Sequence, residues 1–205
     1  MIRFFELGPS PNNTKVRMAL RFKGLEFEAV PVDPFDRAQV VEASGQQLTP
    51  VIEDRGIVLN DSEAILHYLD ANYRETPRLF ASDRAGRKAC DAFKAKLDAE
   101  VATHWAPVFF HAIGVQETLD EDARERFSAA LAALDDALGQ DASFAEGAGP
   151  VNDLRVAEWA TYALPGEGLL ERIPLFNRFR DLYGVAPASL PRLERFLAPW
   201  NERLA

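Results

Sequence analysis

The spacing of apolar residues changes near residue 75, and this change constrains the fold more than any other feature of the sequence. Before it, short apolar runs typical of strands alternate with helical periods in the order β-α-β-α-β-β-α. The first strand, helix and strand predict a right-handed crossover with parallel strands, and the closing hairpin adds an antiparallel strand. The expected strands are 2–7, 27–33, 50–54 and 56–61, and the expected helices are 11–23, 36–43 and 62–73.

Beyond a proline-containing connection over 76–83, only helical periods remain. The first is a long helix in which Pro107 is the candidate position for a kink, because proline removes a backbone hydrogen bond. The sequence therefore predicts an α/β domain over 1–75 and an all-α domain over 84–205. The expected helices of the second domain are 83–112, 120–139, 152–163, 174–183 and 189–203.

Composition narrows the class of function. Apolar residues make up 47% of the 205 residues, which is enough for a packed core, and the formal net charge is -9. This acidity disfavours nucleic acid and anionic membranes as partners. The opening apolar run is too short for a signal peptide, and no run is long enough to span a bilayer. A single cysteine, Cys90, excludes an internal disulfide, and three scattered histidines make a metal centre unexpected, so we expect a cytoplasmic protein.

The segment Ser-Pro-Asn-Asn at 10–13 lies where the first helix begins. Ser10 suits the N-cap position and Pro11 the first helical position, so a structural interpretation is a hydroxyl that caps the helix. A functional interpretation is that the segment holds an anion, because ligands bind at the carboxyl ends of such strands and free amides favour negative charge. Ser10 and Asn12 would then supply further donors.

The segment Gln-Gln-Leu-Thr-Pro at 46–50 precedes the third strand. Pro50 suits a strand start because proline cannot donate to a sheet ladder. If the Thr49–Pro50 bond is cis, the backbone of Val51 becomes available to pair with a group outside the sheet.

The segment Asn-Asp-Ser-Glu at 60–63 precedes the third helix. Asn60 and Glu63 have the spacing of a capping box. That structural interpretation leaves Asp61 and Ser62 unexplained. Together these two could hold the ammonium and carboxylate groups of an amino acid.

The segments SPNNTKVRMALRFKGLEFE, TPVIED and LNDSEAILHYLD, in this order, resemble the thioredoxin-like domain of cytosolic glutathione S-transferases. The helical half and the ending LPRLERFLAPWNERLA are similar to the same family more loosely. The resemblance implies a thioredoxin-like N-terminal domain, an all-α C-terminal domain and a homodimer. It also implies a detoxifying transferase of the serine type, similar to bacterial members, that uses glutathione as co-substrate without a metal.

The resemblance also implies roles for individual residues. Ser10 matches the serine that contacts the glutathione sulfur, and Asn12 matches an asparagine used similarly in some bacterial classes. The cis-proline turn and the backbone that follows it would hold the cysteinyl unit, and the start of the third helix would hold the γ-glutamyl head group. The glutathione-binding residues implied in this way are Gln47, Thr49, Pro50, Val51, Asp61 and Ser62.

The sequence departs from the family pattern at several points. Gln47 and Leu48 stand where the family often has a lysine or arginine for the glycyl carboxylate, and Asp61 is shorter than the usual glutamate or glutamine. In the helical half, Pro150 replaces the hydroxyl residue expected three positions before Asp153, which leaves Asn152 as the candidate cap. The absence of cysteine from 10–13 does not support a glutaredoxin-like mechanism.

The expected mechanism is an activated thiolate that attacks a hydrophobic electrophile. In the family the electrophile binds against the first long helix, which here offers His104, Trp105, Val108, Phe109 and His111. The same helical spacing is typical of core packing, so these positions define only an aromatic-lined pocket. The alternatives are a glutathione-dependent peroxidase, isomerase or dehalogenase, a non-catalytic binding or regulatory module on the same scaffold, and a carrier of hydrophobic ligands.

Overall fold

The computed structural model describes residues 1–138 and 143–204, and the chain divides into two compact units, 1–79 and 80–205. The division falls inside the connection expected at 76–83. Pro77 and Leu79 contact the first unit, since the Pro77 carbonyl accepts from Lys23 Nζ at 2.9 Å and the Leu79 amide donates to Asp70 Oδ1 at 2.8 Å. None of the helices in the described ranges is long and apolar enough to cross a membrane.

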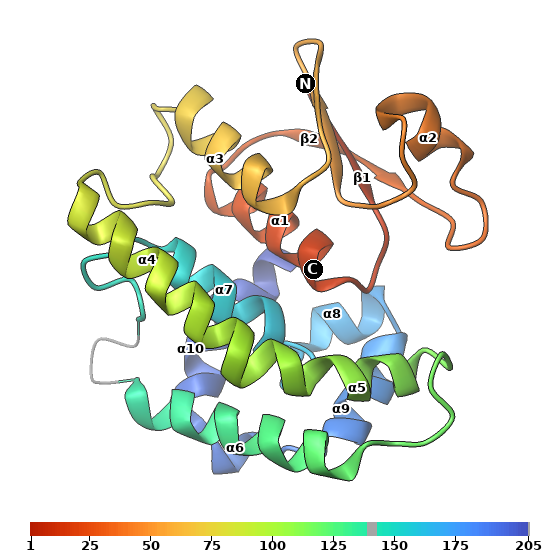
Figure 1. Ribbon diagram of the computed structural model, residues 1–205, viewed down its shortest axis with the longest axis vertical. Helices are drawn as coiled ribbons and strands as arrows, with labels where there is room; N and C mark the ends of the chain where they lie inside the picture. Colours follow the sequence, from red (N-terminus) through yellow and green to blue (C-terminus); the bar gives the residue numbers. More distant parts are fainter. Residues whose placement is uncertain (139–142, 205) are drawn as a thin grey trace. The chain divides into compact units, whose positions relative to one another are not determined.

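The first unit has the predicted order of elements around a four-stranded sheet with strand order β2-β1-β3-β4 (Figure 1). β1 and β2 are parallel, whereas β3 is antiparallel to both β1 and β4. This is the thioredoxin-like arrangement that the sequence predicts. The elements are β1 (Ile2–Glu6), α1 (Pro11–Phe22), β2 (Phe27–Pro31), α2 (Ala38–Ser44), β3 (Val51–Asp54), β4 (Ile57–Leu59) and α3 (Ser62–Asn72).

Alternate residues of β1 pack against helices on opposite faces of the sheet, as the two-residue period of a strand requires. On one face, Phe5 and Val51 form a buried cluster with Val40 and Ala43 of α2. The other face carries Phe4, and α1 and α3 lie side by side there (Figure 1). Both faces of the central strand are thus covered, so its ends have fixed positions.

A buried carboxylate anchors the β3–β4 hairpin to the end of α3. Asp54 is 2% exposed and accepts hydrogen bonds from Tyr68 Oη at 2.9 Å and Tyr73 Oη at 2.5 Å. Burial and the hydrogen bond to Asp54 raise the pKa of Tyr73 to about 12, so its hydroxyl remains a donor throughout the neutral range. Arg55 follows at positive φ (52°) and lies over the Tyr73 ring.

The second unit is helical, as predicted, although several boundaries differ. The element over 167–172 was not predicted, and the expected end of one helix at Gly139 lies outside the described residues. The elements are α4 (Arg84–Leu97), a π-helix (Asp98–Ala102), α5 (Thr103–Ala112), α6 (Glu121–Ala137), α7 (Val151–Ala160), α8 (Glu167–Arg172), α9 (Leu175–Tyr183), a 3-10 turn (Pro187–Ser189) and α10 (Pro191–Leu204).

The long helix expected over 83–112 departs from regular geometry at 98–102, just before Pro107 rather than at it. The π-helical turn ends at Ala102, one residue before Thr103, whose carbonyl the Pro107 ring would crowd. Apolar residues recur every four positions along this helix, which predicts a buried face that includes Ala85, Ala89 and Leu97. Leu97 is buried, but Ala85 and Ala89 are exposed, and Gly86 and Cys90 are buried in their place.

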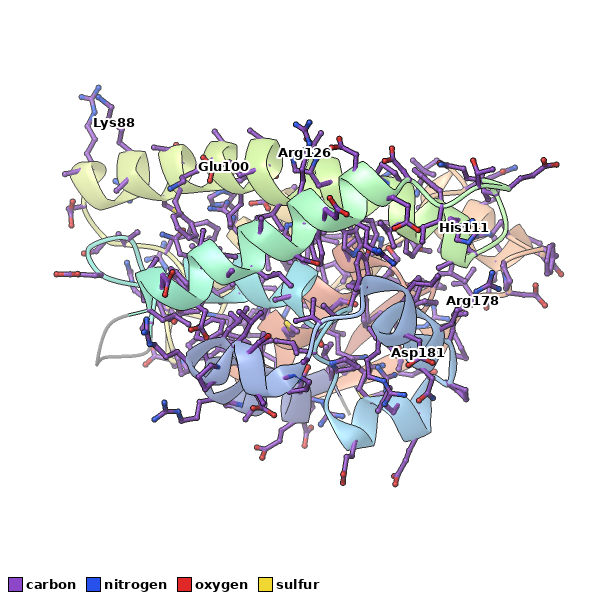
Figure 2. All side chains as sticks on the ribbon, turned by 90° about the horizontal axis from the view of Figure 1, so that it is seen from below. Lys88, Glu100, His111, Arg126, Arg178 and Asp181 are labelled. Atoms are coloured by element: carbon purple, nitrogen blue, oxygen red, sulfur yellow. The ribbon has the colours of Figure 1, made fainter. Side chains whose placement is uncertain are left out.

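α7 is buried on nearly every side and forms the centre of the helical unit. Its Arg155 donates from Nη1 to the Cys90 carbonyl at 3.1 Å and to Cys90 Sγ at 3.0 Å. Charged residues such as Lys88 of α4 and Arg126 of α6 instead lie on the outside of the bundle (Figure 2). The helical unit thus buries polar and charged side chains of α7, among them Arg155 and Glu158, inside an otherwise apolar core.

The start of α7 is not capped by Asn152, which corrects the sequence expectation. Pro150 occupies the N-cap position without a side-chain bond, and Asn152 Nδ2 instead donates to the Phe144 carbonyl at 3.2 Å. Asp153 accepts from Ser143 Oγ at 2.8 Å and from the Phe144 amide at 2.5 Å. Burial raises the pKa of the Asp153 carboxyl, against the opposing effect of these two hydrogen bonds.

We predict that Gly86→Ala destabilises the protein although alanine is the better helix former by about 1 kcal/mol. A Cβ at this position would lie 2.2 Å from the Gly147 carbonyl oxygen and 2.4 Å from Ala81 Cβ. Overpacking of this kind costs about 1–3 kcal/mol, which chemical denaturation would measure as a lower free energy of unfolding. Ala89→Ser on the exposed side of α4 is the control, and an unchanged Gly86→Ala midpoint would contradict this packing.

Candidate active site

Three separate segments meet at one edge of the sheet in the first unit. β1 ends at Glu6 and leads into the start of α1, and the pairing of Phe5 with Val51 places the start of β3 beside it. Since β4 runs antiparallel to β3, with Leu59 opposite Ile52, the chain enters α3 at the same edge. The topology therefore brings together the three polar segments that the sequence singles out.

Asn13 joins two of these segments, and sequence analysis did not identify it. Its side chain is 2% exposed. Oδ1 accepts from the Leu7 amide at 3.3 Å, and Nδ2 donates to Thr49 Oγ1 at 3.0 Å. A second asparagine in the first turn of α1 is the sequence signal for this role, although sequence alone gives no indication of its partners.

Ser10 occupies the N-cap position of α1, but its hydroxyl makes no capping hydrogen bond. The interpretation of Ser10 as a helix-capping side chain is therefore wrong. Only its carbonyl takes part in the helix, accepting from the Thr14 amide at 2.8 Å. Ser10 is half-buried, and its side chain does not provide an acceptor for the first-turn amides of α1.

Lys15 and Arg17, the two cations nearer the start of α1, are paired with acids rather than presented to a ligand. Lys15 is 4% exposed, and its Nζ lies 2.9 Å from Glu63 Oε1 at the start of α3. Arg17 is 6% exposed and pairs with Glu6 of β1. An anion at this edge of the sheet would therefore meet neutral donors and the helix N-terminus rather than these two cations.

The start of α3 contradicts the expected Asn60–Glu63 capping box. Asp61 is the N-cap residue, and its Oδ1 accepts from the Ala64 amide at 2.8 Å. Glu63 contacts Lys15 instead, since that cation lies opposite the first turn of α3. Ser62 Oγ donates to Asn12 Oδ1 at 3.1 Å, which brings these two predicted site residues into contact.

The turn before β3 contains three further predicted site residues, Gln47, Thr49 and Pro50, and leads into a fourth, Val51. The Thr49–Pro50 peptide is cis, as the family resemblance implies, and the unpredicted Gly8–Pro9 bond is also cis. Val51 lies beyond the β3–β4 ladder, which begins at Ile52. Gln47 is exposed and Thr49 contacts Asn13.

The residues expected to line an electrophile pocket lie on α5 and differ in exposure. Val108 is fully buried, and Trp105 is 4% exposed in an aromatic cluster, stacked on Phe109 at a centroid distance of 4.5 Å. His104 and Phe109 are half-buried. Trp105 and Val108 thus belong to the core of the helical unit, and Phe109 and His104 offer the more accessible surface.

His111 lies near the end of α5, at the periphery of the helical unit (Figure 2). Its Nδ1 lies 3.0 Å from the Gln116 carbonyl oxygen, so this ring contacts the loop that follows α5. Within residues 1–138 and 143–204, no three His, Cys, Asp or Glu side chains gather in a way that could hold a metal ion.

Comparison with solved structures identifies the architecture. A rice glutathione S-transferase in complex with glutathione superposes with a TM-score of 0.69 over 98% of this chain and 86% of its own, at 21% identity. The fold is that of the glutathione S-transferases. A possible glutathione S-transferase from Rhodopseudomonas palustris gives a TM-score of 0.67 at 21% identity over 98% of this chain and 94% of its own.

Sequence comparison connects the first unit to the glutathione S-transferases most directly. Residues 4–77 match the family described as glutathione S-transferase, N-terminal domain. Glutathione S-transferase Z1 of Arabidopsis thaliana is 40% identical over 70 residues, which span 32% of this chain and 31% of that protein. Glutathione S-transferase D7 of Anopheles gambiae is 27% identical over 134 residues, or 62% of this chain and 60% of that protein.

We predict that Asn13→Ala lowers the free energy of unfolding by about 1–3 kcal/mol, because it leaves the part-buried Leu7 amide without its acceptor. Denaturant titration would measure the loss. Asn12→Ala is the matched control, since the Asn12 side chain is exposed and the same substitution there should cost less. Equal stabilities for the two variants would show that Asn13 does not hold the segments together.

Proposed function

We propose that this protein is a glutathione transferase in which the Ser10 hydroxyl and the N-terminus of α1 hold the glutathione sulfur as a thiolate. The observation that carries the proposal is that Ser10 stands at the N-cap with a hydroxyl that does not cap its own helix. Asn12, two residues further along the chain in the first turn of α1, contacts Ser62 of α3 and adds a second neutral group at the same edge of the sheet.

The energies are sufficient for this role without a cationic base. A thiol with a pKa of about 8.5 needs about 2.7 kcal/mol of preference for the thiolate to titrate two pH units lower. A hydrogen bond to a charged group contributes about 1.5–3 kcal/mol, and a helix N-terminus adds about 0.3–1 kcal/mol. This agrees with a site in which Lys15 and Arg17 are already paired with carboxylates.

The start of α3 suits the γ-glutamyl head group, which carries both an ammonium and a carboxylate. Asp61 is exposed and uses Oδ1 for its cap, so its carboxylate can also accept from an ammonium group. The Ser62 hydroxyl and the first amides of α3 can donate to a carboxylate. Val51, beyond the end of the β3–β4 ladder, would pair with the cysteinyl backbone.

The remaining assignments extend the same proposal. Residues 1–75 would form the glutathione-binding domain, and 76–83 would link it to the helical domain over 84–205. The helical domain would supply a site for a hydrophobic electrophile, with Phe109 and His104 at its accessible part and Trp105 and Val108 behind them. We further propose that the enzyme is of the serine type and works as a homodimer in the cytoplasm. The reduced state of that compartment suits its single, buried cysteine, Cys90.

Ser10→Ala tests the mechanism. Loss of the hydroxyl should raise the apparent pKa of the bound thiol by about 1–2 units and lower kcat/KM at neutral pH by about 10–100-fold, because a charge-assisted hydrogen bond is removed. The pH–rate profile with a chromogenic electrophile and the absorbance of the bound thiolate both measure it. Ser10→Thr should retain activity, and Ser82→Ala on the exposed connection is the control for the Ser-to-Ala change.

Other results would assign the site differently. An unaltered pH–rate profile in Ser10→Ala would refute the role of Ser10 and make Asn12 the next residue to replace. Tight binding of glutathione without turnover of any electrophile or peroxide would instead identify a non-catalytic binding module.

A further inference from the structure

We infer that the co-substrate class of this site is broader than glutathione and includes γ-glutamyl thiols whose carboxyl-terminal end is uncharged or missing. This inference rests on the proposed function, and it concerns the end of the peptide that neither Ser10 nor α3 would contact. It predicts that an ester or amide at the glycyl carboxylate, or removal of the glycine, is tolerated.

The direction of the bound peptide follows from the three contacts of the proposal. The head group would lie at Asp61 and Ser62, the cysteinyl backbone at Val51 and the sulfur at Ser10. The remaining end must then point away from α3, toward the turn that precedes Val51. That turn connects α2, which ends at Ser44, to β3.

This turn offers no charge to a carboxylate. No residue from 43 to 52 is charged. Leu48, at the centre of the turn, is 75% exposed, so it presents an apolar side chain to whatever lies there. Gln47 is exposed and brings a neutral amide.

The polar groups of the turn are also partly occupied by one another. Gln46 Oε1 accepts from the Leu48 amide at 2.5 Å, and Gln46 Nε2 donates to the Leu48 carbonyl at 2.8 Å and to Ser44 Oγ at 3.0 Å. The Leu48 amide, which could otherwise donate to a ligand, therefore already has an acceptor. The geometry leaves Gln47 as the polar side chain of this turn that is available to the peptide end.

The cations on either side of the turn in sequence, Arg37 and Arg55, do not compensate. Arg55 follows β3, at the opposite end of that strand from the turn, and its guanidinium lies over the Tyr73 ring. Arg37 stands at the start of α2, and the seven residues of that helix separate it from the turn by about 10 Å. Its Nε donates back to the Pro34 carbonyl at 3.3 Å. Of the other cations of the unit, Lys15, Arg17 and Lys23 pair with Glu63, Glu6 and Asp70.

A free carboxylate therefore gains little at this turn, whereas an ester group could bury apolar surface against Leu48. The test is to compare kcat/KM for glutathione with kcat/KM for its glycyl monoethyl ester, in which that carboxylate is esterified and carries no charge. γ-Glutamylcysteine, which lacks the glycine, is compared in the same way. We expect kcat/KM for the ester to be no lower than about one third of kcat/KM for glutathione, because no charge-assisted hydrogen bond is lost. A lower ratio of ester to glutathione would overturn the inference.

Leu48→Lys supplies the missing cation and sharpens the test. It should shift the preference toward the free carboxylate by about tenfold or more, since it creates a charge-assisted contact. Ala71→Lys on the exposed side of α3 adds the same charge elsewhere and should leave the preference unchanged. An equal shift in both variants would mean that net charge, not the turn, sets the preference, and would count against the inference.

Calorimetric binding of the same two compounds separates this inference from the proposed function. If neither compound binds, the proposed function and the inference both fail. If glutathione binds and the ester does not, the proposed function stands and the inference alone is refuted. The wild-type comparison is decisive even if Leu48→Lys does not fold.

Discussion

The arrangement of the candidate site depends on one buried side chain, the amide of Asn13. It joins the end of β1 to the turn before β3, and a neighbouring pair of contacts, Ser62 to Asn12 and Lys15 to Glu63, joins the starts of α1 and α3. Of the seven residues in these contacts, four (Asn12, Asn13, Ser62 and Glu63) belong to the first turns of α1 and α3. Because the partners lie on different elements, the spacing of the site is set by tertiary contacts rather than by any single loop.

The charges around the site have a consistent pattern. Lys15 and Arg17 of α1 pair with carboxylates, and apart from the Asp61 carboxylate, which caps α3, the groups left at the edge of the sheet are hydroxyls, amides and helix N-termini. Such groups stabilise an anion without requiring a titratable partner, so the state of the thiol would depend on its own pKa across the neutral range. The turn around Leu48 is also uncharged, and we infer that this determines which carboxyl-terminal groups of the thiol peptide the site accepts.

The sequence was sufficient for the order of elements in the first unit and for the segments that meet at the candidate site, because these depend on local periodicity and on turn residues. Predictions from the sequence were wrong where a contact with a residue distant in the chain determines the local structure. Asp61 rather than Asn60 caps α3, since Glu63 is drawn to Lys15. Gly86 rather than Ala85 is buried on α4, since the backbone at Gly147 approaches there. Asn13 could not be recognised because both of its partners, Leu7 and Thr49, lie outside its helix.

The most direct test of the central claim is a crystal structure with glutathione bound. We expect the sulfur atom to lie within hydrogen-bond distance of Ser10 Oγ, with the first-turn amides of α1 next to it and the γ-glutamyl group at Asp61 and Ser62. A sulfur atom placed away from Ser10, touching neither its hydroxyl nor those amides, would contradict the proposed chemistry and leave only the fold.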